Sequence, residues 1–215
     1  METGGQPGRK PWFGRGQVYT GDPDLRESQL AGPNPDQRHE LMSVTDHRAI
    51  LGSTAWATEA DTQTFAQKLA QALLSAPQPL NALIELHGQL GAGKTTLARH
   101  LLRALGVSGR IKSPTYGVLE SYQATAQGTP LTLSHLDFYR FNDPDEWEDA
   151  GFRDLFASPG LKLVEWPERV AGQLPPADLQ VFIESLASVG DEDAPRQVRL
   201  HAGTPLGQSL LEALA

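Results

Sequence analysis

The sequence contains no cysteine. Without a thiol the chain can form no disulfide, no zinc–thiolate site and no cysteine nucleophile, and this composition is consistent with a reducing compartment. Long apolar runs are missing too: no stretch reaches the roughly 18 residues of a membrane-spanning helix, and the N-terminus has no hydrophobic signal segment. We therefore expect a cytoplasmic protein with no membrane partner.

The chain has fewer basic than acidic residues, with 18 Lys and Arg against 26 Asp and Glu and a formal net charge of −8. Phosphate contacts along a nucleic acid require clustered Lys and Arg side chains. An acidic chain of this kind is a poor binder of nucleic acid on its own. We expect any contact with RNA to be made through a partner protein.

Residues 1–47 are rich in Gly, Pro and mixed charge and have few aliphatic side chains. Such a segment cannot bury enough apolar surface to fold, so we predict a disordered N-terminal extension. Within it, residues 8–15 interleave basic and aromatic side chains, which could contact RNA or a protein, although a flexible tail is the simpler interpretation. Met42 stands just before the globular pattern begins and is a candidate for the true start.

The most informative stretch lies at residues 80–96. An apolar run from Leu80 to Leu86 predicts a buried strand, and a helical pattern of leucines runs from Leu97 to Leu105. Between them, residues 88–95 read GQLGAGKT, which matches G-x-x-x-x-G-K-[ST] at every fixed position. An ordinary glycine-rich turn is the alternative, but a strand, the full motif and a helix in this order predict a loop that binds a nucleoside triphosphate.

Each part of this loop has a physical role in binding phosphate. Glycines allow successive backbone N–H groups to point at one anion, and the helix that follows offers its unpaired N–H groups to the same phosphates. Lys94 is expected to reach the β- and γ-phosphates of ATP, and the Thr95 hydroxyl to bind Mg²⁺. The predicted nucleotide-binding residues are Gly88, Gln89, Leu90, Gly91, Ala92, Gly93, Lys94, Thr95 and Thr96.

The remaining pattern predicts an α/β domain over residues 48–215, with the three-layer P-loop NTPase fold and a mixed sheet of central parallel and antiparallel edge strands. A helix that Thr58 or Asp61 caps is expected before the phosphate-loop strand. Another helix is expected to begin at residues 142–146, where Asn142 and Pro144 are typical of a helix start. Further strands are predicted at residues 51–57, 117–122, 131–137, 161–166, 179–186 and 197–202, with turns at 123–130 and 191–193 and a helix at 205–214.

Two of the predicted strands end on a carboxylate, Asp137 and Glu165. Ligands of open α/β sheets lie beyond the carboxyl ends of the parallel strands, at the edge where the phosphate loop also lies. Magnesium there takes one or two carboxylates together with phosphate oxygens and water. Asp137, Glu165 and Thr95 are therefore the candidate metal ligands, and the two carboxylates could divide the work of holding the metal and orienting a water. A helix cap or an ion pair is the alternative for each carboxylate.

Three further residues have open interpretations. Thr115 lies where switch segments of P-loop hydrolases sense the γ-phosphate, but a plain Ser-Pro-Thr turn would look the same. Trp166 could stack on a base or on a partner, or could simply be buried. His135 alternates with core residues of its strand, so we expect it to be structural or to support a ligand rather than to be one.

Four segments together, LHGQLGAGKTT, SPTY, HLDFYR and EWPER, resemble the TsaE (YjeE) family of bacterial P-loop ATPases in their order and spacing. The resemblance spans about residues 51–202 and leaves the N-terminal extension uncovered. It implies an ATPase required to make N6-threonylcarbamoyladenosine in the anticodon loop of tRNA. The implied partners are TsaD and TsaB, while TsaC makes the threonylcarbamoyl-adenylate intermediate.

Carried over by position, Thr115 would be the family's switch threonine and Asp137 its magnesium-associated aspartate. Glu165 and Trp166 would match its EW pair, which is implicated in metal binding, hydrolysis and partner contact. The resemblance thus implies Asp137, Glu165 and Thr115 as catalytic residues and Trp166 as a further nucleotide contact. Two departures are Gln89, where many members carry an acidic residue, and Tyr116, where phenylalanine is common.

A small-molecule kinase and a nucleotide-gated binding module with negligible turnover are the alternatives, because a phosphate loop serves transfer as readily as hydrolysis. Kinases of this architecture bring an arginine-bearing lid to the phosphates. The sequence offers only the isolated Arg140 and Arg153 for that purpose, and no lid-like insertion. We expect hydrolysis by the chain alone to be slow.

Overall fold

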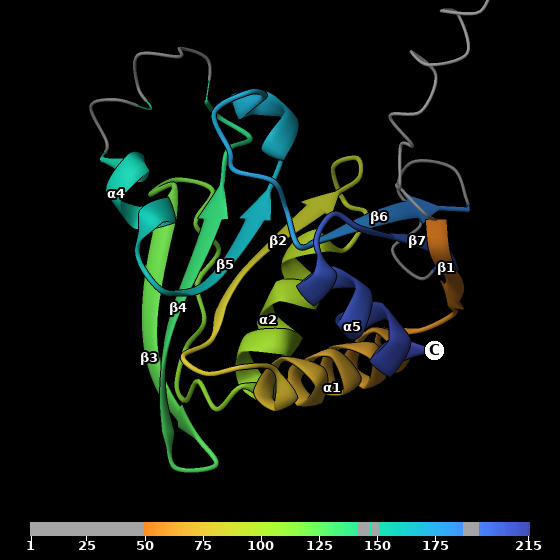
Figure 1. Cartoon of the computed structure of the whole chain (residues 1–215). Coiled ribbons are helices and arrows are strands. Elements are labelled where there is room, and N and C mark those ends of the chain that lie inside the picture. Colours follow the sequence, from red (N-terminus) through yellow and green to blue (C-terminus); the bar gives the residue numbers. More distant parts are fainter. Residues whose placement is uncertain (1–49, 142–146, 148–150, 187–193) are drawn as a thin grey trace, which may run out of the picture. The chain divides into compact units, whose positions relative to one another are not determined.

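The computed structural model describes residues 50–141, 147, 151–186 and 194–215, and these residues are built around a seven-stranded sheet (Figure 1). The strands are β1 (Ile50–Trp56), β2 (Asn81–His87), β3 (Leu119–Ala126), β4 (Thr129–Asp137), β5 (Gly160–Glu165), β6 (Leu179–Ser185) and β7 (Arg196–Ala202). Across the sheet they lie in the order β1-β7-β6-β2-β5-β4-β3.

The middle of the sheet is parallel, as predicted. β2 pairs with β5 on one side and with β6 on the other, and β4 pairs with β5. β2 is buried from Ala82 to Leu86, as is typical of a parallel strand that is covered on both faces. Because parallel strands bring their carboxyl ends to the same edge, Asp137 at the end of β4 is in register with Glu165 at the end of β5.

Both sides of the sheet are antiparallel, which confirms the predicted mixed sheet. β3 pairs with β4, and β7 pairs with β6 and β1. The hairpin between β3 and β4 is tighter than the turn predicted at residues 123–130. β3 continues to Ala126, and only Gln127 and Gly128 turn the chain, with φ of 51° and 79°. Alternate side chains at the end of β3 pack against the core, so the strand extends as far as this packing continues.

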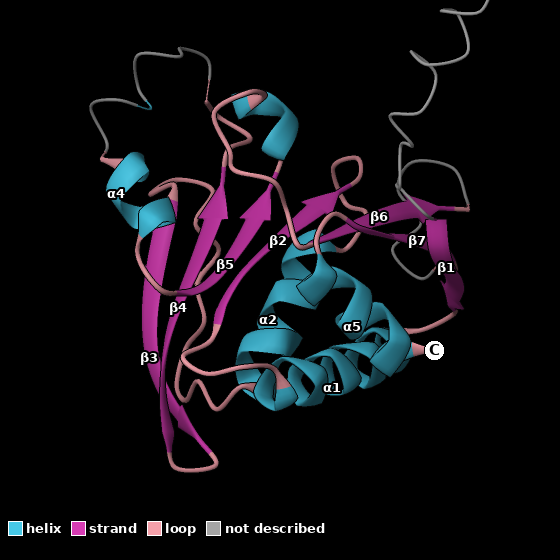
Figure 2. Cartoon of the chain, viewed as in Figure 1, coloured by secondary structure: helices cyan, strands magenta, loops and turns pink. Residues whose placement is uncertain are grey.

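The helices are α1 (Glu59–Ser75), α2 (Lys94–Ala104), α4 (Phe152–Ala157) and α5 (Pro205–Leu214), with a short 3-10 helix, η3 (Pro167–Val170). α1, α2 and α5 lie together on one face of the sheet (Figure 2). Their side chains enclose a core that includes Leu163, whereas the next residue, Val164, belongs to a second buried cluster with Phe138 and Phe152. Successive strand residues face opposite sides, so the sheet has a core on each face and the three-layer fold is confirmed.

Of the two predicted candidates, Thr58 is the N-cap of α1, and Asp61, three residues later, completes a capping box with it. The Thr58 backbone N–H and hydroxyl donate to Asp61 Oδ2 at 2.9 and 3.0 Å. These hydrogen bonds lower the pKa of the Asp61 carboxyl, and the one from the Thr58 backbone has the larger effect. The pair holds the first turn of α1 in place, and this turn forms one wall of the site described below.

Several predicted strand boundaries are wrong by one to four residues, and two of them lie close to the site described below. The strand predicted at 161–166 ends at Glu165, because Trp166 adopts a left-handed conformation, with φ 58° and ψ 47°, and begins η3. The strand predicted from Gly117 begins at Leu119. The predictions for residues 1–47, 142–146 and 191–193 fall outside the described residues. No helix within the described ranges is long and apolar enough to cross a membrane.

Candidate functional site

A cavity of about 640 Å³ lies at the carboxyl ends of the parallel strands. It is lined by the phosphate loop and the start of α2 (residues 90–96), by Asp137 and Glu165 at the strand ends, by the first turn of α1, and by Arg196 at the start of β7. The topology therefore collects in one place residues that are far apart in the sequence.

Two glycines of the phosphate loop have conformations or surroundings that exclude a side chain. Gly88 has φ 144°, and a Cβ there would lie 2.4 Å from the backbone oxygen of Ile183. Gly93 has φ 106°, and a Cβ there would lie 3.3 Å from Nε of Arg196. α2 begins after Gly93, which has no side chain to cap the first turn, so its first N–H groups are suited to an anion.

Lys94 is folded back onto its own loop. Its side chain is buried, and Nζ donates to the backbone oxygens of Gly88 and Gln89 at 2.5 and 2.9 Å. The same atom lies 3.8 Å from the centroid of the Trp166 ring, which is the geometry of a cation–π contact. The lysine that the motif assigns to phosphate is thus held at the cavity by two carbonyls and an aromatic ring.

Burial lowers the pKa of Lys94 below its ordinary value, while the negative charges of Glu165, Glu168 and Asp137 act in the opposite direction. A buried ammonium is costly unless it has acceptors or an anionic partner. The Lys94 ammonium group is therefore suited to bind an anion that enters the cavity.

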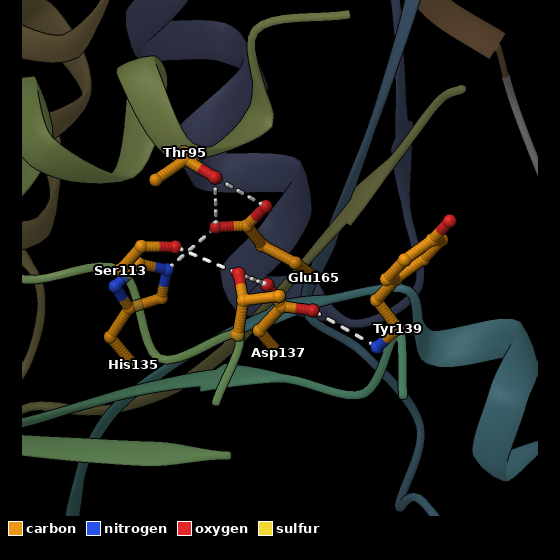
Figure 3. A network of polar contacts seen from close by, with 7 residues as sticks. Thr95, Ser113, His135, Asp137, Tyr139 and Glu165 are labelled. Carbon is orange, nitrogen blue, oxygen red and sulfur yellow. Dashed lines mark hydrogen bonds and ion pairs between the residues drawn. The ribbon is translucent and has the colours of Figure 1, made fainter. Parts of the chain in front are cut away.

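Glu165 is held from two sides (Figure 3). The Thr95 hydroxyl lies 2.9 Å from Oε1 and 2.8 Å from Oε2 of Glu165. From the other side, Nε2 of the fully buried His135 lies 2.8 Å from Oε1. His135 Nδ1 has no hydrogen-bond partner within the part of the chain that the structure describes. The expectation that His135 supports a ligand agrees with this contact.

Asp137 has a separate set of partners. Its Oδ2 accepts a hydrogen bond from the Thr115 hydroxyl at 2.6 Å, and its Oδ1 accepts one from the backbone N–H of Tyr139 at 2.9 Å. Thr115 is in turn 2.9 Å from the Ser113 hydroxyl. The segment around Thr115 is therefore tied directly to a carboxylate of the cavity, as a switch segment would be.

The oxygen atoms of Thr95, Glu165 and Asp137 are of the kind that magnesium prefers. No group of three His, Asp or Glu side chains suited to a metal ion occurs among the described residues. Two carboxylates and a hydroxyl supply only part of a coordination shell. The donor set thus fits a magnesium ion that phosphate oxygens and water complete, and it does not fit a metal held by protein side chains alone.

Nearly all predicted site residues line this cavity. Residues 90–96, Thr115, Asp137, Glu165 and Trp166 do so, whereas Gly88 and Gln89 instead supply the carbonyls that bind Lys94.

The cavity is also lined by residues that were not predicted: Tyr139, the first turn of α1 and Arg196. The predicted candidates for a lid arginine, Arg140 and Arg153, do not line it, and the Arg140 guanidinium lies 4.3 Å from the ring centroid of the exposed Tyr116. No local pattern pointed to Arg196, because the residue that it contacts in the loop lies 104 positions away.

A larger cavity of about 760 Å³ lies between α1 and α5. Its lining includes Lys68 and Ser75 but no carboxylate and no part of the phosphate loop. Chemistry therefore favours the smaller cavity as the functional site.

Comparison with known proteins agrees with the motifs. The model of the family described as "Threonylcarbamoyl adenosine biosynthesis protein TsaE" matches residues 56–192. A curated tRNA threonylcarbamoyladenosine biosynthesis protein TsaE from Haemophilus influenzae is 38% identical over 151 residues, which cover 70% of this chain and 89% of that protein. The protein of the same name from a Synechocystis species is 40% identical over 122 residues, with coverage of 53% and 68%.

A solved structure has a similar fold. The crystal structure of YdiB from Bacillus subtilis superposes with a TM-score of 0.55 at 28% identity, over 76% of this chain and 94% of that one. The family match contains the phosphate loop, both carboxylates and Trp166. With more than half of its length matched by the family model and a relative at 38% identity that it covers almost entirely, the chain belongs to the TsaE family.

Proposed function

We propose that this chain is a magnesium-dependent ATPase that acts in the synthesis of N6-threonylcarbamoyladenosine on tRNA, the process for which its relatives are named. One observation carries the proposal: Lys94, Thr95, Asp137 and Glu165 line a single cavity with the phosphate loop. A phosphate loop with its lysine, a metal-binding hydroxyl and acidic side chains are the parts that ATP hydrolysis requires.

The residues of the cavity divide the work as follows. The N–H groups of the loop and the first turn of α2 bind phosphate oxygens, and Lys94 exchanges the carbonyls of Gly88 and Gln89 for them. Thr95 and Glu165, whose side chains are hydrogen-bonded to each other, would hold magnesium, which neutralises negative charge on the phosphates when it is bound. Asp137, which the family resemblance associates with magnesium, would instead orient a water, because its hydrogen bond from Thr115 links it to the switch segment.

We further propose that the chain works in the cytoplasm with a complex of TsaD and TsaB homologues and meets tRNA only through that complex. The net charge of −8 supports indirect contact with tRNA. Arg196 is held on the carbonyl of Ala92, so a positive charge from a partner would assist the transfer of the phosphoryl group, and hydrolysis by the chain alone would be slow.

Phosphate release tests the proposal when it is measured for the chain alone and with TsaD–TsaB, each with magnesium and with a chelator. We expect slow release alone, faster release in the complex, and loss of both on chelation. A pull-down with and without ATP should show that ATP strengthens association. Fast turnover alone with phosphorylation of a small metabolite would indicate a kinase. ATP-dependent association with no phosphate release would indicate a nucleotide-gated binding module.

A further inference from the structure

Arg196 connects β7, the last strand in the sequence, to the phosphate loop. It is half-buried at the start of β7 and lines the nucleotide cavity. Its Nε donates to the backbone oxygen of Ala92 at 3.0 Å, and its Nη1 donates to that of Ala194 at 3.3 Å. Two carbonyls, one in the loop and one beside β7, thus hold the guanidinium in a fixed place.

The loop is shaped to receive this side chain. Gly93 leaves space for it, because a Cβ at that position would lie 3.3 Å from Nε and 3.6 Å from Cδ of Arg196. Ala92 is buried, and its own N–H donates to the backbone oxygen of Gln89 at 3.1 Å. The peptide groups on both sides of Ala92 are therefore fixed by hydrogen bonds.

The contact determines which way the next N–H points. In a planar trans peptide the C=O and the N–H point in opposite directions. While Arg196 holds the oxygen of Ala92, the N–H of Gly93 in the same peptide group must point away from the guanidinium. A loop that cradles an anion needs N–H groups turned inward and carbonyls turned outward, where a donor can satisfy them.

We propose that Arg196 is a positioning residue of the phosphate loop, which fixes the Ala92–Gly93 peptide in the orientation that binds nucleotide phosphates. This inference rests on the proposed nucleotide site. It concerns a residue that lies beyond the family match at residues 56–192.

Arg196 and Lys94 have different tasks in this arrangement. Lys94 binds the carbonyls at the start of the loop, Gly88 and Gln89. In the proposed function it leaves them to bind phosphate. Arg196 binds the carbonyl of Ala92 near the end of the loop, and this hydrogen bond remains when nucleotide is bound. Its charge also favours an anion in the cavity, because the cavity is partly screened from water.

The variant Arg196→Gln tests the proposal, with Arg196→Lys as the conservative change. Arg199→Gln is the matched control, because Arg199 lies on the same strand, is exposed, pairs with Glu184 and does not line the cavity. Calorimetric titration with ADP should show an affinity about tenfold weaker for Arg196→Gln, an intermediate loss for Arg196→Lys, and no loss for Arg199→Gln. Thermal unfolding without nucleotide identifies any variant that has lost its fold.

A second readout separates positioning from general destabilisation. In ¹⁵N-labelled protein the amide signal of Gly93 should move in Arg196→Gln before any nucleotide is added, and it should respond less to ADP than in the wild type. Equal ADP affinity in Arg196→Gln and the wild type, or an unchanged Gly93 signal, would overturn the inference while the proposed function stands. Failure of the wild type to bind ADP would instead overturn the proposed function.

Discussion

The Thr95 hydroxyl lies within 2.9 Å of both carboxylate oxygens of Glu165, although the two residues are 70 positions apart in the sequence. A hydroxyl that gives its hydrogen to a carboxylate keeps its lone pairs for a metal ion. Asp137 lies opposite Glu165 in the register of β4 and β5, but its carboxylate accepts a hydrogen bond from Thr115 and not from Thr95. The two carboxylates therefore have different partners, and substitutions should separate their effects.

Glu165→Gln should raise the magnesium concentration that gives half-maximal hydrolysis, because it removes a negative charge next to Thr95. Asp137→Asn should lower kcat by about a hundredfold, the usual contribution of a positioned acid or base, with a smaller change in the magnesium requirement. Phosphate release across a magnesium titration, with TsaD–TsaB present, measures both. Equal shifts in the magnesium requirement would contradict this division of roles.

Lys94→Ala should weaken the binding of a non-hydrolysable ATP analogue by about 1.5–3 kcal/mol, the usual contribution of a hydrogen bond to a charged group. Calorimetric titration measures the change. Lys68→Ala, which removes an exposed lysine of α1 outside the cavity, is the control for net charge. If Lys94→Ala binds the analogue as tightly as that control, the assignment of the phosphate loop is wrong.

His135→Leu should lower both the melting temperature and kcat, because it removes a buried donor from the Glu165 carboxylate, at a cost of about 1–3 kcal/mol. His135→Gln can still donate to that carboxylate and should retain more of each. Thermal unfolding and phosphate release distinguish the two variants. Wild-type kcat in a folded His135→Leu protein would show that the imidazole has no part in positioning Glu165.

Asp61→Asn should lower the melting temperature at neutral pH, because the capping carboxylate is replaced. The folded state lowers the pKa of Asp61, chiefly through the backbone N–H of Thr58, so its stabilisation is present above the ordinary pKa and is lost as the pH falls through the lowered one. The difference in melting temperature between wild type and variant should therefore shrink on acidification. Glu212→Gln, at an exposed position of α5, is the control, and a difference that stays constant with pH would argue against the cap.

The parts of the fold that could be predicted are those that local chemistry decides. The apolar run of β2, the glycines of the loop and the cap at Thr58 each act within a few residues of sequence. A turn within residues 123–130 was predicted, but its restriction to Gln127 and Gly128 could not be, because glutamine rarely takes a positive φ and the length of the hairpin follows from packing against the core. The same holds for Trp166, whose left-handed conformation ends β5 one residue early.

The candidate site was predictable to the extent that its residues belong to motifs. The contacts between them were not, because they depend on which strands are neighbours. His135 meets Glu165 only because β4 lies beside β5, and Arg196 meets Ala92 only because the chain returns to the sheet as β7. Periodicity alone contains no information on either pairing.

The position of β7 has a consequence for how the protein is made. Within the described chain β1 pairs with β7 alone, and Arg196 arrives with that same strand, 104 residues after Ala92. During translation the phosphate loop therefore leaves the ribosome long before β7, which supplies Arg196. Among the described strands β1 pairs only with β7, so it also remains unpaired until β7 is made. Nascent chains stalled before Arg196 should retain little ADP, whereas chains in which β7 has left the ribosome should bind it, so ADP binding reports that β7 has joined the sheet.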